Sequence, residues 1–198
     1  MAWKICLADS EVGGSGLIFQ ETQLAGAFVL EVQRHEDNRG FFGRTFCVRE
    51  FAEHGLNPSC MQCNISFNAR KGTLRGMHVQ VAPHEEAKLV RCTMGAIHDV
   101  IVDLREHSET YLQHVACELS AENRRMLFIP EGFAHGFLTL TDSTEVFYQM
   151  SSMYVPGSAF GFRHDDPTLD LPWPGRVVEI SEQDRTWPDY QANTRSDG

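Results

Sequence analysis

The amino-acid sequence predicts an all-β fold, a jelly-roll barrel with a few short helices, in one domain that covers residues 1–198. Short runs with strand-like patterning recur along the chain, and turn-forming residues separate them. Helical periodicity is almost absent. So many short strands in 198 residues, of which 42% are hydrophobic, are typical of a double sheet closed around an interior pocket.

The elements follow from local patterns. The first strand is expected at residues 27–33, and a turn follows at residues 37–40. The best helix candidate is residues 49–54, because Gly55 ends it. Tight hairpins are expected at Gly95 and at residues 142–143. Residues 1–24 are assigned as a loose leader, and residues 172–198 as a strap over the barrel or a frayed tail. Further antiparallel strands are predicted at residues 41–46, 61–67, 73–81, 88–94, 96–103, 114–119, 125–129, 137–140 and 144–150.

Composition excludes several classes of function. The formal net charge of -10 argues against nucleic acid or an anionic membrane as the main partner, since both need a basic surface. The sequence contains no long apolar run, and its N-terminus does not have the pattern of a secretory signal peptide. The six cysteines lie in apolar stretches, which is typical of reduced thiols in a reducing compartment. We therefore expect a cytoplasmic protein, and we interpret the CxxC pair Cys60 and Cys63 as structural.

The run Leu74–Gln80 concentrates polar groups within an apolar, strand-like segment. Alternation places His78 and Gln80 on one face with Gly76, and Met77 and Val79 on the other. Gly76 leaves room for a close approach to the backbone. A lone strand histidine is more often structural than catalytic, but Arg75 and Lys88 lie in the same neighbourhood. The run therefore predicts a pocket wall.

A second motif, Pro130-x-Gly132-x-x-His135, resembles the second cupin motif, whose histidine often binds a metal. The first cupin motif has a His-x-His pair, whereas this chain has Gln80 after His78. The loop residues His84, Glu85 and Glu86 offer replacement ligands without a fixed geometry. A metal-free acid–base pocket fits these residues better, so no metal and no cofactor are expected.

Taken together, these motifs resemble the dTDP-4-dehydrorhamnose 3,5-epimerases, metal-free cupins that act on nucleotide-linked sugars. The resemblance covers nearly the whole chain and includes residues 37–42, 62–66, 74–78, 88–91, 99–105, 119–123 and 129–137, Tyr148, Tyr154, Asp166, and residues 173–174. It implies a jelly-roll homodimer whose substrate is a nucleotide-linked 4-keto-6-deoxyhexose.

The resemblance also implies roles for individual residues. A ketone at C4 acidifies the hydrogens on C3 and C5, so an epimerase needs a base, a donor on the opposite face, and a group that stabilises the enolate. His78 matches the base, because an unperturbed imidazole has a pKa of about 6.5. Asp166 matches its partner carboxylate, with Asp165 as a rival and a turn-capping role as an alternative. Lys88 and Arg75 are candidates for the enolate oxygen and its neighbours, and Tyr148 is the expected acid, with Tyr154 as the alternative. Residues that match substrate or diphosphate contacts are Arg39, Gln62, Asn64 and His135.

The chain departs from the family in the segment that resembles the nucleotide-base contact. Related enzymes commonly have an aromatic residue and a glutamate after Phe42, where this chain has Gly43 and Arg44. Arg44 is either a surface charge or a contact to a different base or altered sugar. Gln149 replaces a frequent lysine, and this replacement is either neutral or bears on which carbon is inverted.

Three hypotheses follow. The first is a 3,5-epimerase that converts dTDP-4-dehydro-6-deoxy-D-glucose to dTDP-4-dehydro-L-rhamnose. The second is a single-carbon epimerase or a ketoisomerase on a related nucleotide sugar. The third is a non-catalytic or metal-dependent cupin.

Overall fold

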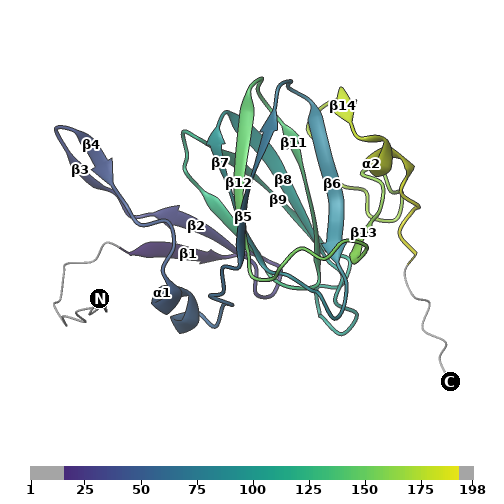
Figure 1. The fold of residues 1–198 in the computed structure, drawn as a ribbon, viewed down its shortest axis with the longest axis horizontal. Helices are drawn as coiled ribbons and strands as arrows, with labels where there is room; N and C mark the ends of the chain where they lie inside the picture. The colour runs from purple at the N-terminus through teal and green to yellow at the C-terminus, as the bar shows by residue number, and fades with distance from the viewer. Residues whose placement is uncertain (1–15, 192–198) are drawn as a thin grey trace, which may run out of the picture.

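The computed structural model describes residues 16–191 and contains two facing β-sheets (Figure 1). The first sheet has the strand order β1 (Leu17–Glu21), β2 (Phe28–Val32), β10 (Met126–Ile129), β7 (Lys88–Met94), β12 (Thr144–Met150) and β5 (Gln62–Asn68). The second has the order β13 (Ala159–Gly161), β6 (Thr73–Gln80), β11 (Phe133–Thr139), β8 (Ala96–Asp103) and β9 (His114–Ser120). The predicted all-β architecture is confirmed.

The core explains why the two sheets face each other. Alternate residues of β7, β8, β10 and β12 point between the sheets, so Val90, Ile97, Leu127 and Val146 are completely buried there. Burial of each such side chain contributes about 1.5–3 kcal/mol. This apolar cluster fills one part of the space between the sheets, and a pocket lined by both polar and apolar side chains occupies another part.

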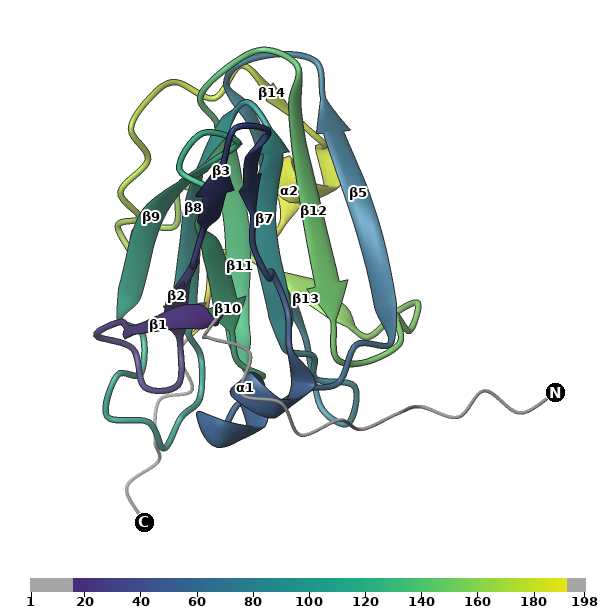
Figure 2. The same cartoon turned by 90° about the vertical axis from the view of Figure 1, so that its left-hand side faces the viewer.

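A second cluster closes one end of the sandwich. Helix α1 (Val48–Glu53) places Phe51 against Phe128, with ring centroids 5.6 Å apart, close to the predicted helix at residues 49–54. Phe19 of β1 also packs on the Phe51 ring, with ring centroids 5.6 Å apart. Figure 2 shows α1 at the end of the sheets, below β10. The prediction of a loose leader was therefore wrong for residues 17–24, because apolar side chains there join the core, including fully buried Leu24. Residues 1–15 of the predicted leader lie outside the described residues.

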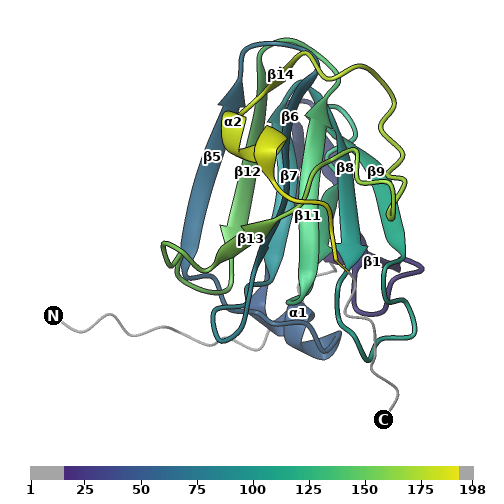
Figure 3. The same ribbon diagram turned by 90° about the vertical axis from the view of Figure 1, so that its right-hand side faces the viewer.

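The C-terminal segment lies across the outer face of the second sheet (Figure 3). It contributes β14 (Glu179–Ile180), which pairs parallel with β6 and is an exception to the predicted antiparallel pattern, and helix α2 (Glu182–Thr186). Met77, Val79, Val100 and Val102 are buried beneath this segment and the chain that precedes it. Residues 172–191 lie over this face and are called the C-terminal strap below, whereas residues 192–198 lie outside the described residues.

The short hairpin of β3 (His35–Asp37) and β4 (Gly40–Phe42) projects away from both sheets (Figure 1). The predicted turn at residues 37–40 joins its strands, but the strand predicted at residues 41–46 ends at Phe42. Within residues 16–191, no helix is both long and apolar enough to cross a membrane.

Candidate active site

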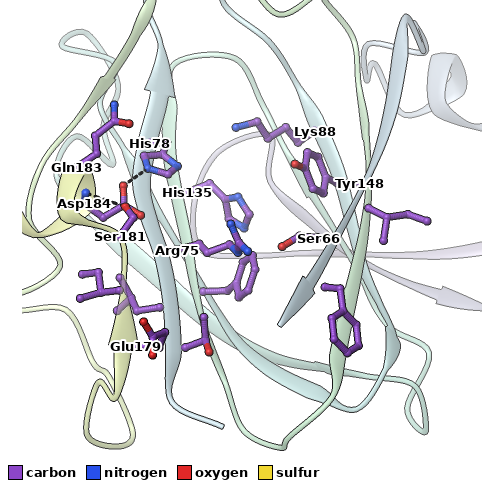
Figure 4. Close-up of a pocket in the computed structure, with 16 residues that line it drawn as sticks. Ser66, Arg75, His78, Lys88, His135, Tyr148, Glu179, Ser181, Gln183 and Asp184 are labelled. Carbon is purple, nitrogen blue, oxygen red and sulfur yellow. Dashed lines mark hydrogen bonds and ion pairs between the residues drawn. The ribbon is translucent and has the colours of Figure 1, made fainter. Parts of the chain in front are cut away.

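A pocket of about 650 Å³ lies between the two sheets and reaches the C-terminal strap (Figure 4). The first sheet contributes residues of β5, β7 and β12, the second contributes residues of β6 and β11, and the strap contributes residues 179–184. The lining residues are Ile65, Ser66, Phe67, Thr73, Leu74, Arg75, His78, Lys88, His135, Phe137, Tyr148, Glu179, Ile180, Ser181, Gln183 and Asp184.

A smaller chamber of about 280 Å³ adjoins this pocket. His78, Lys88, Tyr148 and Gln183 line both, so the candidate base, cation and acid lie where the two spaces meet. The chamber is completed by Asn64, Val79, Gln80, Glu86, Met150, Tyr154, Ala159 and Trp187.

His78 projects from β6 and forms a close contact with α2. Its Nε2 lies 2.6 Å from Oδ1 of Asp184, and the backbone N–H of Gly76 donates to Oδ2 at 3.3 Å. Burial alone would raise the pKa of the Asp184 carboxyl, but hydrogen bonding to His78, the charge of His78, and bonds from Gly76 and Ser181 hold this pKa below its ordinary value. Asp184 occupies Nε2 of His78, so Nδ1 is left to face a ligand.

The structure corrects the predicted partner of this histidine. Asp166 is buried, but its Oδ1 accepts a bond from the N–H of Thr168 at 2.8 Å and its Oδ2 accepts the N–H of Tyr190. It therefore secures the strap and does not contact His78. The rival Asp165 pairs with Arg163 at 2.9 Å on the surface.

A sequence signal for Asp184 was present. Ser181 is the N-cap of α2, and its Oγ accepts the N–H of Asp184 at 3.0 Å. A serine followed three residues later by an acidic residue is a pattern typical of a helix start. This pattern predicts where the helix begins, but it does not predict that the helix packs against β6.

A β-bulge in β6 changes which side chains share a face. His78 pairs with His135 of β11, but Arg75 pairs with Phe137, so β6 uses one more residue than β11 between these points. Arg75 and His78 consequently both line the pocket, although simple alternation assigns them to opposite faces. Gly76 has φ of +121°, and a Cβ there would lie 2.5 Å from Cα of Gly136. The close approach predicted at this glycine is thus made by β11.

His135 belongs to a second histidine–carboxylate pair in the pocket. Its Nε2 lies 2.7 Å from Oδ1 of Asp99, whose side chain is completely buried in β8. Sequence reasoning missed Asp99, although a carboxylate in the apolar strand Ala96–Asp103 needs a partner. On the pocket floor, the guanidinium of Arg75 donates to Oδ1 of Asn68 at 2.8 Å.

Lys88 and Tyr148 face His78 from the first sheet (Figure 4). Tyr148 is opposite Val90 in the ladder between β12 and β7. Lys88 precedes Val90 by two residues in β7, so the Tyr148 ring and the Lys88 side chain share a face. Nζ of Lys88 lies 3.0 Å from Oε1 of Glu86, and the two side chains are only 15% and 7% exposed. Glu86, which the sequence suggested only as a possible metal ligand, therefore orients the ammonium group.

The other predicted substrate residues separate into two groups. Asn64 and Tyr154 line the smaller chamber, and Gln62 accepts the backbone N–H of Tyr154 without lining either space. In contrast, Arg39 and Phe42 lie on the projecting hairpin. The side chain of Arg39 is 89% exposed, and Phe42 as a whole residue is 71% exposed. Arg44 pairs with Glu50 of α1. Arg39, Phe42 and Arg44 therefore line neither the pocket nor the smaller chamber of their own chain.

The arrangement is suited to moving protons beside a carbonyl group. The imidazole lies on one side, the phenol lies across from it, and a lysine lies next to the phenol. Among residues 16–191, no group of three or more histidine, cysteine, aspartate or glutamate side chains is arranged to hold a metal ion. Fold and site together define a jelly-roll enzyme of the acid–base isomerase class.

Comparisons with known proteins agree with this class. A family model described as dTDP-4-dehydrorhamnose 3,5-epimerase matches residues 21–192. A dTDP-4-dehydrorhamnose 3,5-epimerase of Methanothermobacter thermautotrophicus is 44% identical over 178 residues, which are 88% of this chain and 95% of the relative. The chain belongs to the dTDP-4-dehydrorhamnose 3,5-epimerase family, and it is an epimerase.

Solved structures give the same result. The dTDP-4-dehydrorhamnose 3,5-epimerase of Bacillus anthracis, with TDP and PPi bound, has a TM-score of 0.85 at 38% identity and covers 88% of this chain and 100% of its own. The dTDP-6-deoxy-D-glucose-3,5-epimerase of Legionella pneumophila, in complex with dTDP-4-keto-L-rhamnose, has a TM-score of 0.80 at 35% identity, with coverages of 89% and 100%.

Proposed function

We propose that this protein inverts C3 and C5 of dTDP-4-dehydro-6-deoxy-D-glucose and forms dTDP-4-dehydro-L-rhamnose. The observation that carries the proposal is the His78–Asp184 pair facing Lys88 and Tyr148 across one pocket. The ligands named for the related structures, TDP and dTDP-4-keto-L-rhamnose, support a substrate of this class.

The proposed reaction divides the work among these four side chains. Nδ1 of His78 removes a proton from a carbon next to the C4 ketone, and Asp184 stabilises the resulting imidazolium. The electrons move to the ketone oxygen, where the ammonium group of Lys88 stabilises the enolate. Tyr148 then returns a proton from the opposite face, which inverts the carbon. The same four groups act at each carbon in turn.

Substrate contacts are assigned by position. Arg75 and His135 line the larger pocket but not the smaller chamber, and provide hydrogen-bond donors for oxygens of the nucleotide sugar. Asn64 and Tyr154 line the smaller chamber beside His78 and Tyr148, next to the reacting carbons. Gln62 acts indirectly, through the backbone of Tyr154.

We further propose a homodimer in which the projecting hairpin of one chain reaches the pocket of the other. Arg39, Phe42 and Arg44 match substrate-binding positions of the family, but they lie away from their own pocket. A hairpin with exposed aromatic residues that extends from the body of a chain is suited to contact with a second copy. The free thiols among residues 16–191 support a cytoplasmic location.

Incubation of the enzyme with dTDP-4-keto-6-deoxyglucose in heavy water tests the reaction. We expect NMR of the product to show deuterium at C3 and C5 with both centres inverted, and a His78→Asn variant to lose exchange at both carbons by about 100-fold or more. Label at a single inverted carbon identifies a single-carbon epimerase, and a carbonyl moved to C3 identifies a ketoisomerase. Absence of exchange in wild-type protein, or its abolition by a chelator, supports the third hypothesis and contradicts the proposal.

A further inference from the structure

Two exposed cysteines lie side by side where the chain enters β5. Sγ of Cys60 and Sγ of Cys63 are 3.5 Å apart, and neither forms a disulfide. Among the other cysteines of residues 16–191, Cys92 is buried, while Cys47 and Cys117 are partly buried. Cys60 and Cys63 are therefore an accessible pair of neighbouring thiols.

Regular strand geometry does not bring these thiols together. Residues three apart in a strand point to opposite faces. The ladder of β5 begins at Gln62, which pairs with Met150, and Cys60 precedes it. The chain is attached just before the ladder by the N–H of Met61, which donates to the carbonyl of Met150 at 2.8 Å. Because Cys60 lies before the ladder, its side chain does not follow the alternation of β5, and it lies against Cys63.

The surroundings make the two thiols chemically different. Nε2 of Gln149 donates to Sγ of Cys60 at 3.4 Å, and an N–H donor stabilises a thiolate. Burial raises the pKa of the Cys63 thiol, and the hydrogen bond and charge of Cys60 raise it further, against a smaller lowering by a hydrogen bond from Gln149. Because its raised pKa keeps the Cys63 thiol protonated, we expect Cys60 to attack first and Cys63, whose Sγ lies 3.5 Å away, to act second.

The pair is also connected to the proposed active site. Gln149, which bonds Cys60, directly follows Tyr148 in β12, and Cys63 is opposite Gln149 in the ladder. On the other strand, Cys63 lies between Gln62, which holds the backbone of Tyr154, and Asn64, which lines the smaller chamber. We therefore expect a change at Cys63 to reach Asn64 through the chain, and Tyr154 through the hydrogen bond that Gln62 accepts.

We propose that Cys60 and Cys63 form a modification site for small-molecule disulfides, at which the enzyme is converted between a dithiol and a disulfide form. The Cys60 thiolate attacks one sulfur of the small disulfide, a mixed disulfide forms, and one small thiolate leaves. The Cys63 thiol loses its proton to solvent and attacks Sγ of Cys60, which expels the second small thiolate. Two protein thiols are oxidised, and one small disulfide is reduced to two thiols.

Closing the pair converts the sulfur acceptor of Gln149 into a weaker disulfide sulfur, and we expect it to draw the start of β5 toward Cys63. Asn64 and Tyr154 contact substrate in the proposed function, so we expect KM for the nucleotide sugar to rise about threefold or more, while kcat changes less. This kinetic effect rests on the proposed function, whereas the thiol chemistry does not.

The experiment treats purified, fully reduced protein with oxidised glutathione and follows intact mass, peptide maps and kinetics. We expect a mass lower by two hydrogen atoms, a peptide in which Cys60 and Cys63 are joined by a disulfide, and reversal by a reducing agent. Cys63→Ser should stop at the mixed disulfide on Cys60, and Cys60→Ser should react more slowly. Cys47→Ser and Cys6→Ser serve as matched controls that should close like wild type.

Three outcomes contradict the proposal. The first is a wild-type protein that retains glutathione on Cys60 without closing, and the second is a linked peptide that contains other cysteines. The third is a closed protein whose KM equals that of the reduced protein and of Cys60→Ser. Failure of the proposed function itself is distinguishable, since the reduced protein would then have no epimerase activity while the mass change still occurred.

Discussion

Asp184 and Asp166 are both buried carboxylates of the C-terminal region, but only Asp184 touches His78. We expect Asp184→Asn to lower kcat by about 100-fold or more, because an amide neither holds the imidazole in the same tautomer nor stabilises its charged form. The measurement is steady-state turnover together with solvent deuterium exchange at the sugar.

Asp166→Asn is the matched control. Its oxygens accept backbone N–H groups, so we expect kcat within a few fold of wild type and a stability loss of about 1 kcal/mol. A larger catalytic loss in Asp166→Asn than in Asp184→Asn would overturn the assignment of the base partner.

The two tyrosines separate proton removal from inversion. Tyr148 lines both spaces opposite His78, whereas Tyr154 is 54% exposed and lines only the smaller chamber. We expect Tyr148→Phe to retain deuterium exchange at a substrate carbon but to form little inverted product, since His78 still takes and returns protons on its own face. Tyr154→Phe should be close to wild type in turnover. If instead Tyr154→Phe shows exchange without inversion, the donor is Tyr154.

At the scale of elements, one carboxylate organises the connection between β8 and β9. Asp103 accepts bonds from Nε and Nη2 of Arg105 at 2.8 and 2.7 Å, from Ser108 at 2.5 Å and from Thr110 at 2.7 Å. Burial alone would raise the pKa of Asp103, but these donors lower it from 3.8 to about 2. The ionised form therefore stabilises the fold at neutral pH.

This lowered pKa leads to a prediction with a definite sign. Because the folded-state pKa lies below the unfolded one, the stabilisation is complete above about pH 4 and is lost as the pH falls toward 2. Asp103→Asn should lower the free energy of unfolding by about 2 kcal/mol at pH 7, and by less than half of that at pH 2.5. Urea unfolding at both pH values measures the difference. Asp170→Asn, at an exposed position, is the control. If Asp103→Asn lowers the free energy of unfolding equally at both pH values, the explanation is contradicted.

At the scale of the whole molecule, the projecting hairpin predicts complementation between two defective chains. Arg39→Ala keeps the His78–Asp184 pair, and His78→Asn keeps the hairpin. If each pocket uses the partner's hairpin, each variant alone is impaired, while a mixed dimer contains one complete pocket. After equal mixing and subunit exchange, half of the dimers are mixed, so we expect about a quarter of wild-type activity.

Turnover assays after mixing, with the dimer verified by light scattering, measure this recovery. Co-expression of the two variants provides mixed dimers even where exchange between purified dimers is slow. Activity that equals the average of the two separate variants would place Arg39 in its own pocket or outside the site altogether.

The sequence by itself determined the features that depend on local patterns. Alternation and turn residues predicted most strands, and three of them, residues 88–94, 96–103 and 144–150, have the predicted bounds. Ordered motifs predicted the family, which the comparisons confirmed, and named His78, Lys88, Tyr148, Arg75 and His135, all of which line the larger pocket.

Only the tertiary structure decided the remaining features, because they depend on contacts between distant segments or on departures from regular geometry. Asp184 meets His78 across 106 residues of sequence, through the packing of α2 against β6, and a local pattern contains no information about that packing. A one-residue bulge reverses the expected face of Arg75 relative to His78. The hairpin, finally, separates Arg39 and Phe42 from their own pocket, since its direction depends on how its base joins the sheets and not on its own residues.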